Sequence, residues 1–90
     1  MVGYFATSLA GHDKNQIYII IKEDDEYVYL SDGRLKPINS PKKKNKKHIQ
    51  IIKKDTDAFL AQKLINGECV RDEEIKRTIK LYEQKQCKQI

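Results

Sequence analysis

Long apolar runs are missing from this chain of 90 residues. The longest, residues 17–21, falls far short of the ~20 residues that a membrane-spanning helix requires, and it suits a buried strand. The N-terminal stretch MVGYFATSLAG also lacks the basic head and apolar core of a secretion signal. We therefore expect a cytoplasmic protein with no membrane partner.

Cysteine is scarce too. Cys69 and Cys87 are separated by 17 residues, which is not a CxxC pair, and His12 and His48 lie far from both in the sequence. In a reducing compartment such cysteines are free thiols, and their spacing disfavours a zinc site. We therefore expect no metal and no other cofactor.

Motifs for catalysis and for nucleotide binding are absent as well. The chain has no P-loop and no glycine-rich dinucleotide fingerprint. His12 and Asp13 are adjacent, but neighbours in a turn rarely activate a nucleophile. The acidic residues at 24–26 are better explained by a solvated turn between strands than by a metal site. The sequence thus predicts neither an enzyme nor a protein with a small-molecule substrate.

Acidic residues are missing from one window, residues 36–54, which carries eight lysines. Residues 1–35 have a net charge of −3 and residues 55–90 of zero, so this window holds the positive excess of the chain. Clustered lysines repel one another, and phosphates relieve the repulsion while releasing counterions. The window lacks the apolar face that a lipid surface requires. It favours RNA or DNA as the partner; a solvated loop and a localisation signal are the alternatives.

The first half of the chain does contain short segments rich in β-branched and aromatic residues, separated by turn-forming residues. These segments are residues 3–8, 16–23, 27–31 and 48–52. Asp32 and Gly33 predict a hairpin turn, after which residues 34–38 should return as a further strand. The lysines at 42–47 should then form a loop. Four or five strands joined by tight turns indicate a small β-barrel within residues 1–54.

The last third, residues 55–90, predicts a helical extension packed on that barrel. A short helix should end at Asn66-Gly67, since glycine commonly terminates helices. A longer helix over residues 71–86 should have Asp72 as its N-cap. One apolar stripe of this helix should dock on the barrel or on the preceding helix. The stripe consists of Ile75, Ile79 and Tyr82.

Residues 10–21, AGHDKNQIYIII, resemble a KOW motif, which has a strand, a loop with one essential glycine and a second strand of alternating apolar residues. Gly11 occupies the position of that glycine. Residues 27–50 are similar to the matching region of small bacterial KOW-domain RNA-binding proteins, which themselves resemble large-subunit ribosomal proteins of archaea and eukaryotes. The matching residues are Gly3, Ser8, Gly11, Asp13, Lys14, Tyr18, Asp32, Gly33, Pro41, Lys42, Lys44, Asn45, Lys47 and His48.

Two residues of the first loop depart from the family pattern. His12 stands where an arginine is usual, and Asn15 stands where a glycine is usual. Asparagine tolerates left-handed backbone conformations well, so the turn itself should survive. Loss of the arginine removes a permanent charge and a bidentate phosphate contact. RNA binding through this loop should therefore be weaker and dependent on pH.

The resemblance implies a mainly β protein with C-terminal helices, in which a small five-stranded SH3-like β-barrel is followed by one short and one longer α-helix. It also implies a non-catalytic RNA-binding protein, associated with the ribosome or with translation, that binds structured RNA such as ribosomal RNA. The candidate RNA-binding residues are Gly11, His12, Lys14, Asn15, Arg34, Lys36, Lys42, Lys43, Lys44, Lys46, Lys47 and His48.

The candidate residues have different expected roles. The lysines should contact phosphates, and Arg34 and Lys36 should extend their track along the neighbouring strand. His48 either contacts RNA or packs on the barrel. We expect Tyr27 and Tyr29 in the core, with stacking on bases as the alternative. The alternative function is a protein-interaction adaptor that uses the barrel and the C-terminal helix.

Overall fold

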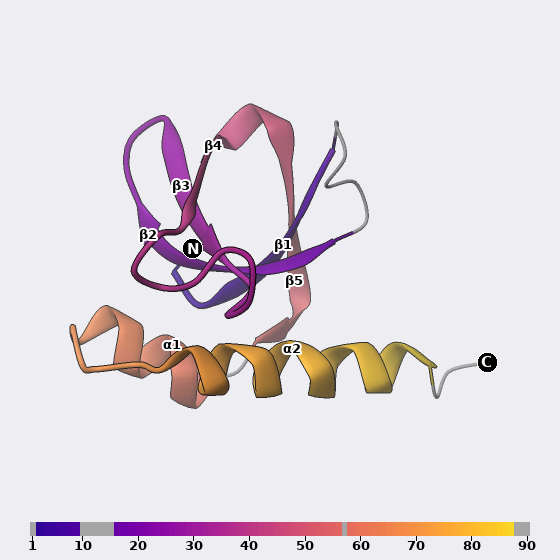
Figure 1. The fold of residues 1–90 in the computed structure, drawn as a ribbon. Coiled ribbons are helices and arrows are strands. Elements are labelled where there is room, and N and C mark those ends of the chain that lie inside the picture. The colour runs from indigo at the N-terminus through magenta and orange to yellow at the C-terminus, as the bar shows by residue number, and fades with distance from the viewer. Residues whose placement is uncertain (1, 10–15, 57, 88–90) are drawn as a thin grey trace.

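The computed structural model describes residues 2–9, 16–56 and 58–87, which form a five-stranded antiparallel sheet and two α-helices (Figure 1). The strands lie in the order β4-β3-β2-β1-β5, and the sheet curls into a half-barrel. The elements are β1 (Tyr4–Ser8), β2 (Ile17–Glu23), β3 (Tyr27–Ser31), β4 (Lys42–Asn45), the 3-10 helix η1 (Lys46–His48), β5 (Ile49–Thr56), α1 (Ala58–Ile65) and α2 (Asp72–Cys87). A mainly β chain with C-terminal helices is thereby confirmed.

The first three strands match their predicted ranges to within one residue. β2 is the middle strand of the sheet, and its consecutive residues Tyr18, Ile19 and Ile20 are all buried. Strand geometry points neighbouring side chains to opposite faces, so both faces of β2 must be covered. This explains why the sequence of β2 has a continuous apolar run and does not alternate between apolar and polar residues.

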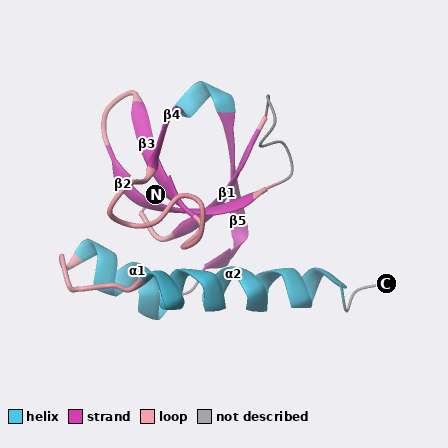
Figure 2. Cartoon of the chain, viewed as in Figure 1, coloured by secondary structure: helices cyan, strands magenta, loops and turns pink. Residues whose placement is uncertain are grey.

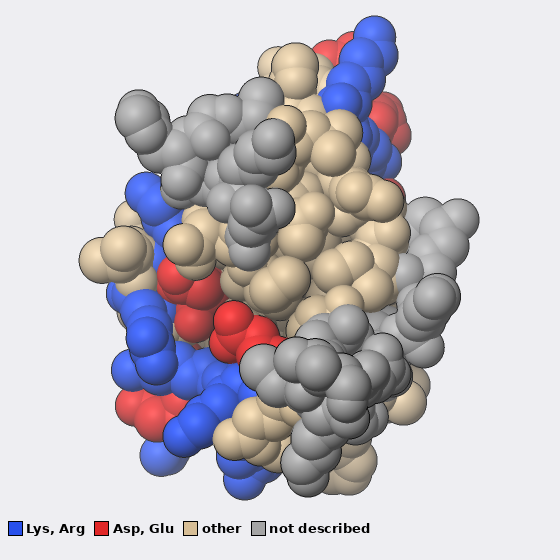
Figure 3. Space-filling model, turned by 90° about the vertical axis from the view of Figure 1, so that its right-hand side faces the viewer, with Lys and Arg blue, Asp and Glu red and all other residues tan. Residues whose placement is uncertain are grey.

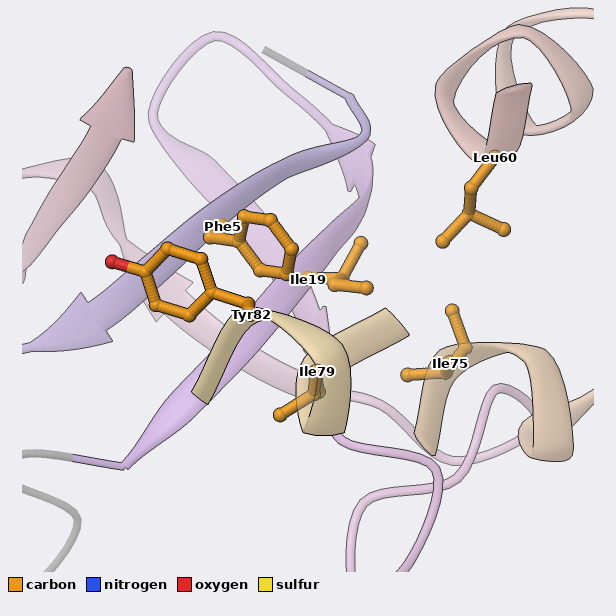
Figure 4. Close-up of a cluster of buried hydrophobic side chains, with 6 residues drawn as sticks. All are labelled: Phe5, Ile19, Leu60, Ile75, Ile79 and Tyr82. Carbon is orange, nitrogen blue, oxygen red and sulfur yellow. The ribbon is translucent and has the colours of Figure 1, made fainter. Parts of the chain in front are cut away.

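The sheet has an apolar cluster on each face. On the inner face, residues of β3 pack with Ile49 of β5, although two strands separate them, because the sheet curls around this cluster. The inner cluster consists of Ala6, Tyr18, Ile20, Val28, Leu30 and Ile49. The outer cluster lies between the sheet and the helices (Figure 4) and consists of Phe5, Ile19, Leu60, Ile75, Ile79 and Tyr82.

The apolar stripe of α2 docks on the sheet, as its spacing indicated. The rings of Phe5 from β1 and Tyr82 from α2 stack, with centroids 4.5 Å apart and an angle of 27° between their planes (Figure 4). Ile75 is fully buried in the same cluster. The stripe therefore forms the main apolar contact of α2 with the half-barrel.

The predicted strand over residues 34–38 is wrong. The Asp32 carboxylate accepts hydrogen bonds from the backbone N–H groups of Arg34 (2.8 Å) and Lys36 (3.0 Å). The Asp32 N–H in turn donates to the Lys36 carbonyl at 3.1 Å. These bonds close a capped loop in place of a two-residue hairpin turn. Pro37 follows the loop and lacks an N–H group with which to continue a strand ladder.

The returning strand is the lysine segment itself, which was expected to be a loop. β4 pairs antiparallel with β3, from Lys42 opposite Leu30 to Asn45 opposite Tyr27. Lysine is depleted in strands, but at the edge of a sheet its alkyl stem can lie on apolar neighbours while the ammonium group reaches water. The η1 turn that follows β4 lies on the side of the half-barrel away from α1 and α2 (Figure 2).

β5 and α1 differ little from expectation. β5 runs to Thr56, so the strand passes the predicted domain boundary at residue 54. α1 ends at the predicted glycine, where the Gly67 N–H donates to the Leu64 carbonyl (3.3 Å) and the Glu68 N–H to the Lys63 carbonyl (2.9 Å). This pair of bonds is a Schellman motif, which satisfies the last carbonyls of the helix.

The N-cap of α2 is Arg71, one residue before the predicted Asp72. The Arg71 carbonyl accepts from the N–H groups of Glu74 (3.0 Å) and Ile75 (3.4 Å) in the first turn. The Arg71 N–H donates to the Glu74 carboxylate at 3.0 Å. Glu74 also pairs with Lys63 of α1 at 2.8 Å. The Asp72 carboxylate instead accepts from the Ile38 N–H at 2.8 Å and ties the loop before β4 to α2.

Candidate nucleic-acid interface

The alternation of β4 divides its lysines between the two faces of the sheet. Lys43 lies opposite Tyr29 and is exposed on the outer face. Lys42 and Lys44 lie opposite buried residues of β3 and share their inner face, where both lysines are half-buried. The lysines that were predicted to act as one phosphate-binding surface therefore do not share one face.

Tyr27 and Tyr29 belong to neither apolar cluster of the described residues, so the expectation that they form part of the core is wrong. Both are half-buried on the outer face. Lys43 Nζ lies 4.4 Å from the centroid of the Tyr27 ring, and Lys22 Nζ lies 5.4 Å from that of the Tyr29 ring. Both distances are within the range of cation–π contacts. We call these residues, Lys22, Tyr27, Tyr29 and Lys43, the tyrosine–lysine face.

Lys22 is a residue of this face that the sequence did not predict. The pairing of β2 with β3 shifts between Ile20 and Lys22, so that Lys22, and not Ile21, lies opposite Tyr29. Without this β-bulge, strict alternation would place Lys22 on the inner face with Ile20. The bulge leaves no recognisable signal in the sequence, because it contains neither glycine nor proline.

Lys46 is neutralised within the chain. Its Nζ lies 3.0 Å from Oε2 of Glu23, and the hydrogen bond from Lys46 lowers the pKa of the Glu23 carboxyl. Glu23 is therefore charged at neutral pH. Asn45 caps the following turn, where its side chain accepts from the Lys47 N–H at 2.9 Å. Lys47 and His48 are exposed on this turn.

Positive charges elsewhere in the β4–η1 segment (residues 42–48) repel one another. Burial lowers the pKa of the Lys42 ammonium group, and the positive charge of Lys44 lowers it further. Within the part of the chain that the structure describes, no carboxylate pairs with Lys43, Lys44 or Lys47. The segment thus presents a positive charge that intramolecular acids only partly compensate.

Arg34 and Lys36 do not extend the lysines of β4 along a strand, because both belong to the capped loop after β3. Arg34 lines a cleft of about 220 Å³ between this loop, β2 and α2, in which acidic side chains lie beside basic ones. The charged residues of the cleft are Asp32, Arg34, Lys76, Lys80 and Glu83. Figure 3 shows basic and acidic side chains beside one another at the lower left and again at the upper right.

The candidate residues of the first loop, Gly11, His12, Lys14 and Asn15, lie outside the described residues. Comparisons with protein-family models and with curated proteins find no match to this chain. The likeness to KOW-domain proteins therefore stays a prediction that rests on the residues quoted above. The half-barrel and its lysine-bearing edge are the structural findings.

Other kinds of site have little support in the same residues. Among residues 2–9, 16–56 and 58–87, no three His, Cys, Asp or Glu side chains gather so as to hold a metal ion. No helix in these ranges is long and apolar enough to cross a membrane. Cys69 is an exposed free thiol. The lysine-rich edge is thus the most distinctive chemical feature of the described surface.

Proposed function

We propose that this protein is a non-catalytic RNA-binding protein that holds phosphates with the β4–η1 segment. The observation that carries the proposal is the set of lysines without carboxylate partners, Lys43, Lys44 and Lys47, on one edge strand and the turn that follows it. The potentials of close charges add, and each phosphate contact releases condensed counterions.

The likeness to KOW-domain proteins favours RNA over other polyanions. In this proposal the half-barrel is an SH3-like barrel, and the protein acts in the cytoplasm, at the ribosome or in translation. Structured RNA such as ribosomal RNA is the ligand. Contacts between lysines and phosphates position RNA without reading its sequence, so affinity should vary little among sequences of equal length and shape.

The alternative function is an adaptor for proteins that uses the barrel and the C-terminal helix, with the apolar stripe of α2 as one docking surface. Ile75, Ile79 and Tyr82 are buried against the sheet and are therefore occupied. An acidic protein segment would still satisfy the lysines. Capture of partners from an extract with and without RNase separates the two functions, because RNA-mediated partners are lost after RNase treatment.

A salt titration of RNA binding tests the proposal. The logarithm of the association constant should fall linearly with the logarithm of salt concentration, by about 0.7–0.9 for each phosphate neutralised. Replacement of Lys43, Lys44 and Lys47 by Ala should reduce this slope by about 2–3 and weaken binding to all RNAs alike. The melting temperature should change little at Lys43 and Lys47, since exposed lysines contribute little to stability, and the half-buried Lys44 should account for most of any loss.

The matched control replaces three exposed cations of α2, Lys76, Arg77 and Lys80, by Ala, which changes the net charge equally. This control should keep most of the salt dependence. An affinity that does not respond to salt would exclude phosphate binding. Equal losses in the two triple variants would show that net charge, and not the β4–η1 segment, holds the RNA.

A further inference from the structure

We propose that the tyrosine–lysine face stacks on unpaired RNA bases, so that the protein prefers single-stranded RNA segments to duplex. This inference rests on the proposed RNA binding and names the part of the RNA that the face recognises. The ligand class is an extended run of nucleotides, with bases on Tyr27 and Tyr29 and phosphates on Lys22 and Lys43.

The face lies where the helices leave the sheet uncovered. The outer cluster beneath α1 and α2 takes side chains from β1 and β2, and Ile52 of β5 packs against it. Among the described residues, it takes none from β3 or β4. The outer face of β3 and β4 therefore extends past the area of the sheet that α1 and α2 cover. It carries Tyr27, Tyr29 and Lys43, with Lys22 from the adjacent strand. Two exposed lysines flank two half-buried aromatic rings there.

The spacing of the rings selects unpaired nucleotides. Tyr27 and Tyr29 are two residues apart on one strand, so their side chains emerge about 6.6–6.8 Å apart. This is about twice the 3.4 Å rise between neighbouring nucleotides along one strand of a duplex. Neighbouring bases can each reach a ring only if they are unstacked from one another. Single-stranded loops and ends allow this, whereas a duplex does not.

The lysines beside the rings can supply the phosphate contacts of such a ligand. Lys43 lies over Tyr27 and Lys22 over Tyr29, at 4.4 Å and 5.4 Å from the ring centroids. A base that stacks on the ring takes the place of the ammonium group, which then moves a few ångströms to the phosphate of the same nucleotide. An exposed cation–π contact is weaker than the stacking of a base on an aromatic side chain, so this exchange favours binding.

The face is also continuous with the β4–η1 segment, because Lys43 belongs to both. A strand of RNA whose phosphates lie along that segment therefore passes the tyrosine rings. The two contacts have different physical signatures. Phosphate contacts respond to salt, whereas base stacking tolerates any sequence and adds little salt dependence.

The test compares a short oligouridine strand with a blunt-ended RNA duplex of equal charge, in titrations at several salt concentrations. Tyr27→Leu and Tyr29→Leu should each weaken binding of the single strand by about 5- to 150-fold, the usual loss for removing one stacking partner. Both variants should leave duplex binding and the salt slope unchanged. Tyr27→Phe, which keeps the ring, should bind like the wild type, whereas Lys43→Ala should lower the slope by about 1.

A second measurement does not depend on how well the variants fold. A 2-aminopurine base placed in the single strand should lose fluorescence when the wild-type protein binds, because stacking quenches it. A wild type that prefers the duplex, or Leu variants that bind the single strand normally, would overturn the stacking proposal. If the triple lysine variant has then lost affinity, phosphate binding stands without the face. If the wild type binds neither RNA, both proposals fail.

Discussion

Gly3 tests how closely α1 approaches β1. Gly3 is buried, and its φ of +91° is a left-handed value that residues with a Cβ atom rarely adopt. A Cβ added there would lie 2.6 Å from Ala61 Cα and nearer still to Ala61 Cβ. Gly3→Ala must therefore either move α1 away from the sheet or pull the start of β1 out of place.

Two costs add at this position. Left-handed backbone strain costs roughly 1–2 kcal/mol, and overpacking adds about 1–3 kcal/mol, so we expect a loss of about 2–5 kcal/mol in the free energy of unfolding. Gly67 is the matched control. Its φ is +72°, but no atom of the described residues lies within 4 Å of an added Cβ. Gly67→Ala should therefore show the strain alone, about 1–2 kcal/mol.

The assay is urea and thermal unfolding followed by far-ultraviolet circular dichroism. In a domain of this size each kcal/mol lowers Tm by about 4–8 °C, so Gly3→Ala should melt at least about 4 °C below Gly67→Ala. The urea m-value should not change, because the surface exposed on unfolding is the same. Equal melting temperatures for the two variants would refute the close contact between β1 and α1.

Two further predictions concern the outer cluster and the ion pair of the β4–η1 segment. Ile75→Ala should lower the free energy of unfolding in urea by about 2–5 kcal/mol, because Ile75 is fully buried. The control Leu81→Ala changes a residue of the same helix that is 52% exposed, and it should lower this free energy by less than about 1 kcal/mol. Because Lys46 lowers the pKa of Glu23 in the folded chain, Glu23 contributes stability at neutral pH that is lost as the pH falls below about 4. Glu23→Gln should thus flatten the stability profile in this acidic range, with a small effect at pH 7; an unchanged profile would mean that the pair is not formed in solution.

Elements with local signals were predictable. β2 and β3 follow from runs of β-branched and aromatic residues bounded by the polar turn at residues 24–26. Gly67 follows the end of α1 as predicted. This end depends only on a local backbone conformation with positive φ, which glycine adopts readily. The apolar stripe of α2 could be predicted from the spacing of its residues, because the apolar face of a helix must be buried against some partner.

Elements that depend on distant partners were not predictable. β4 forms because β3 offers a free edge, which overrides the poor strand propensity of lysine. The Asp32 carboxylate caps its own loop, and this capping competes successfully with the hairpin turn that Asp32-Gly33 suggests. Asp72 accepts from Ile38, a residue far away in the chain, so it does not serve as the N-cap.

The candidate interface was predictable in composition but not in arrangement. The lysines of β4 and η1 were visible as a block of charge in the sequence. Which of them face outward depends on strand alternation, and the presence of Lys22 beside Tyr29 depends on the bulge in β2. Neither the edge position nor the bulge can be read from residue types alone, because both are properties of the pairing of strands.

β4 is the last strand on its side of the described sheet, so one row of its backbone groups has no neighbouring strand. A second copy of the chain that added a strand there would cover the inner face beside Lys42 and Lys44 and draw their ammonium groups away from water. Charges that point inward at an open edge protect against the pairing of that edge with a strand of another chain. The half-buried lysines thus make this edge a poor template for aggregation.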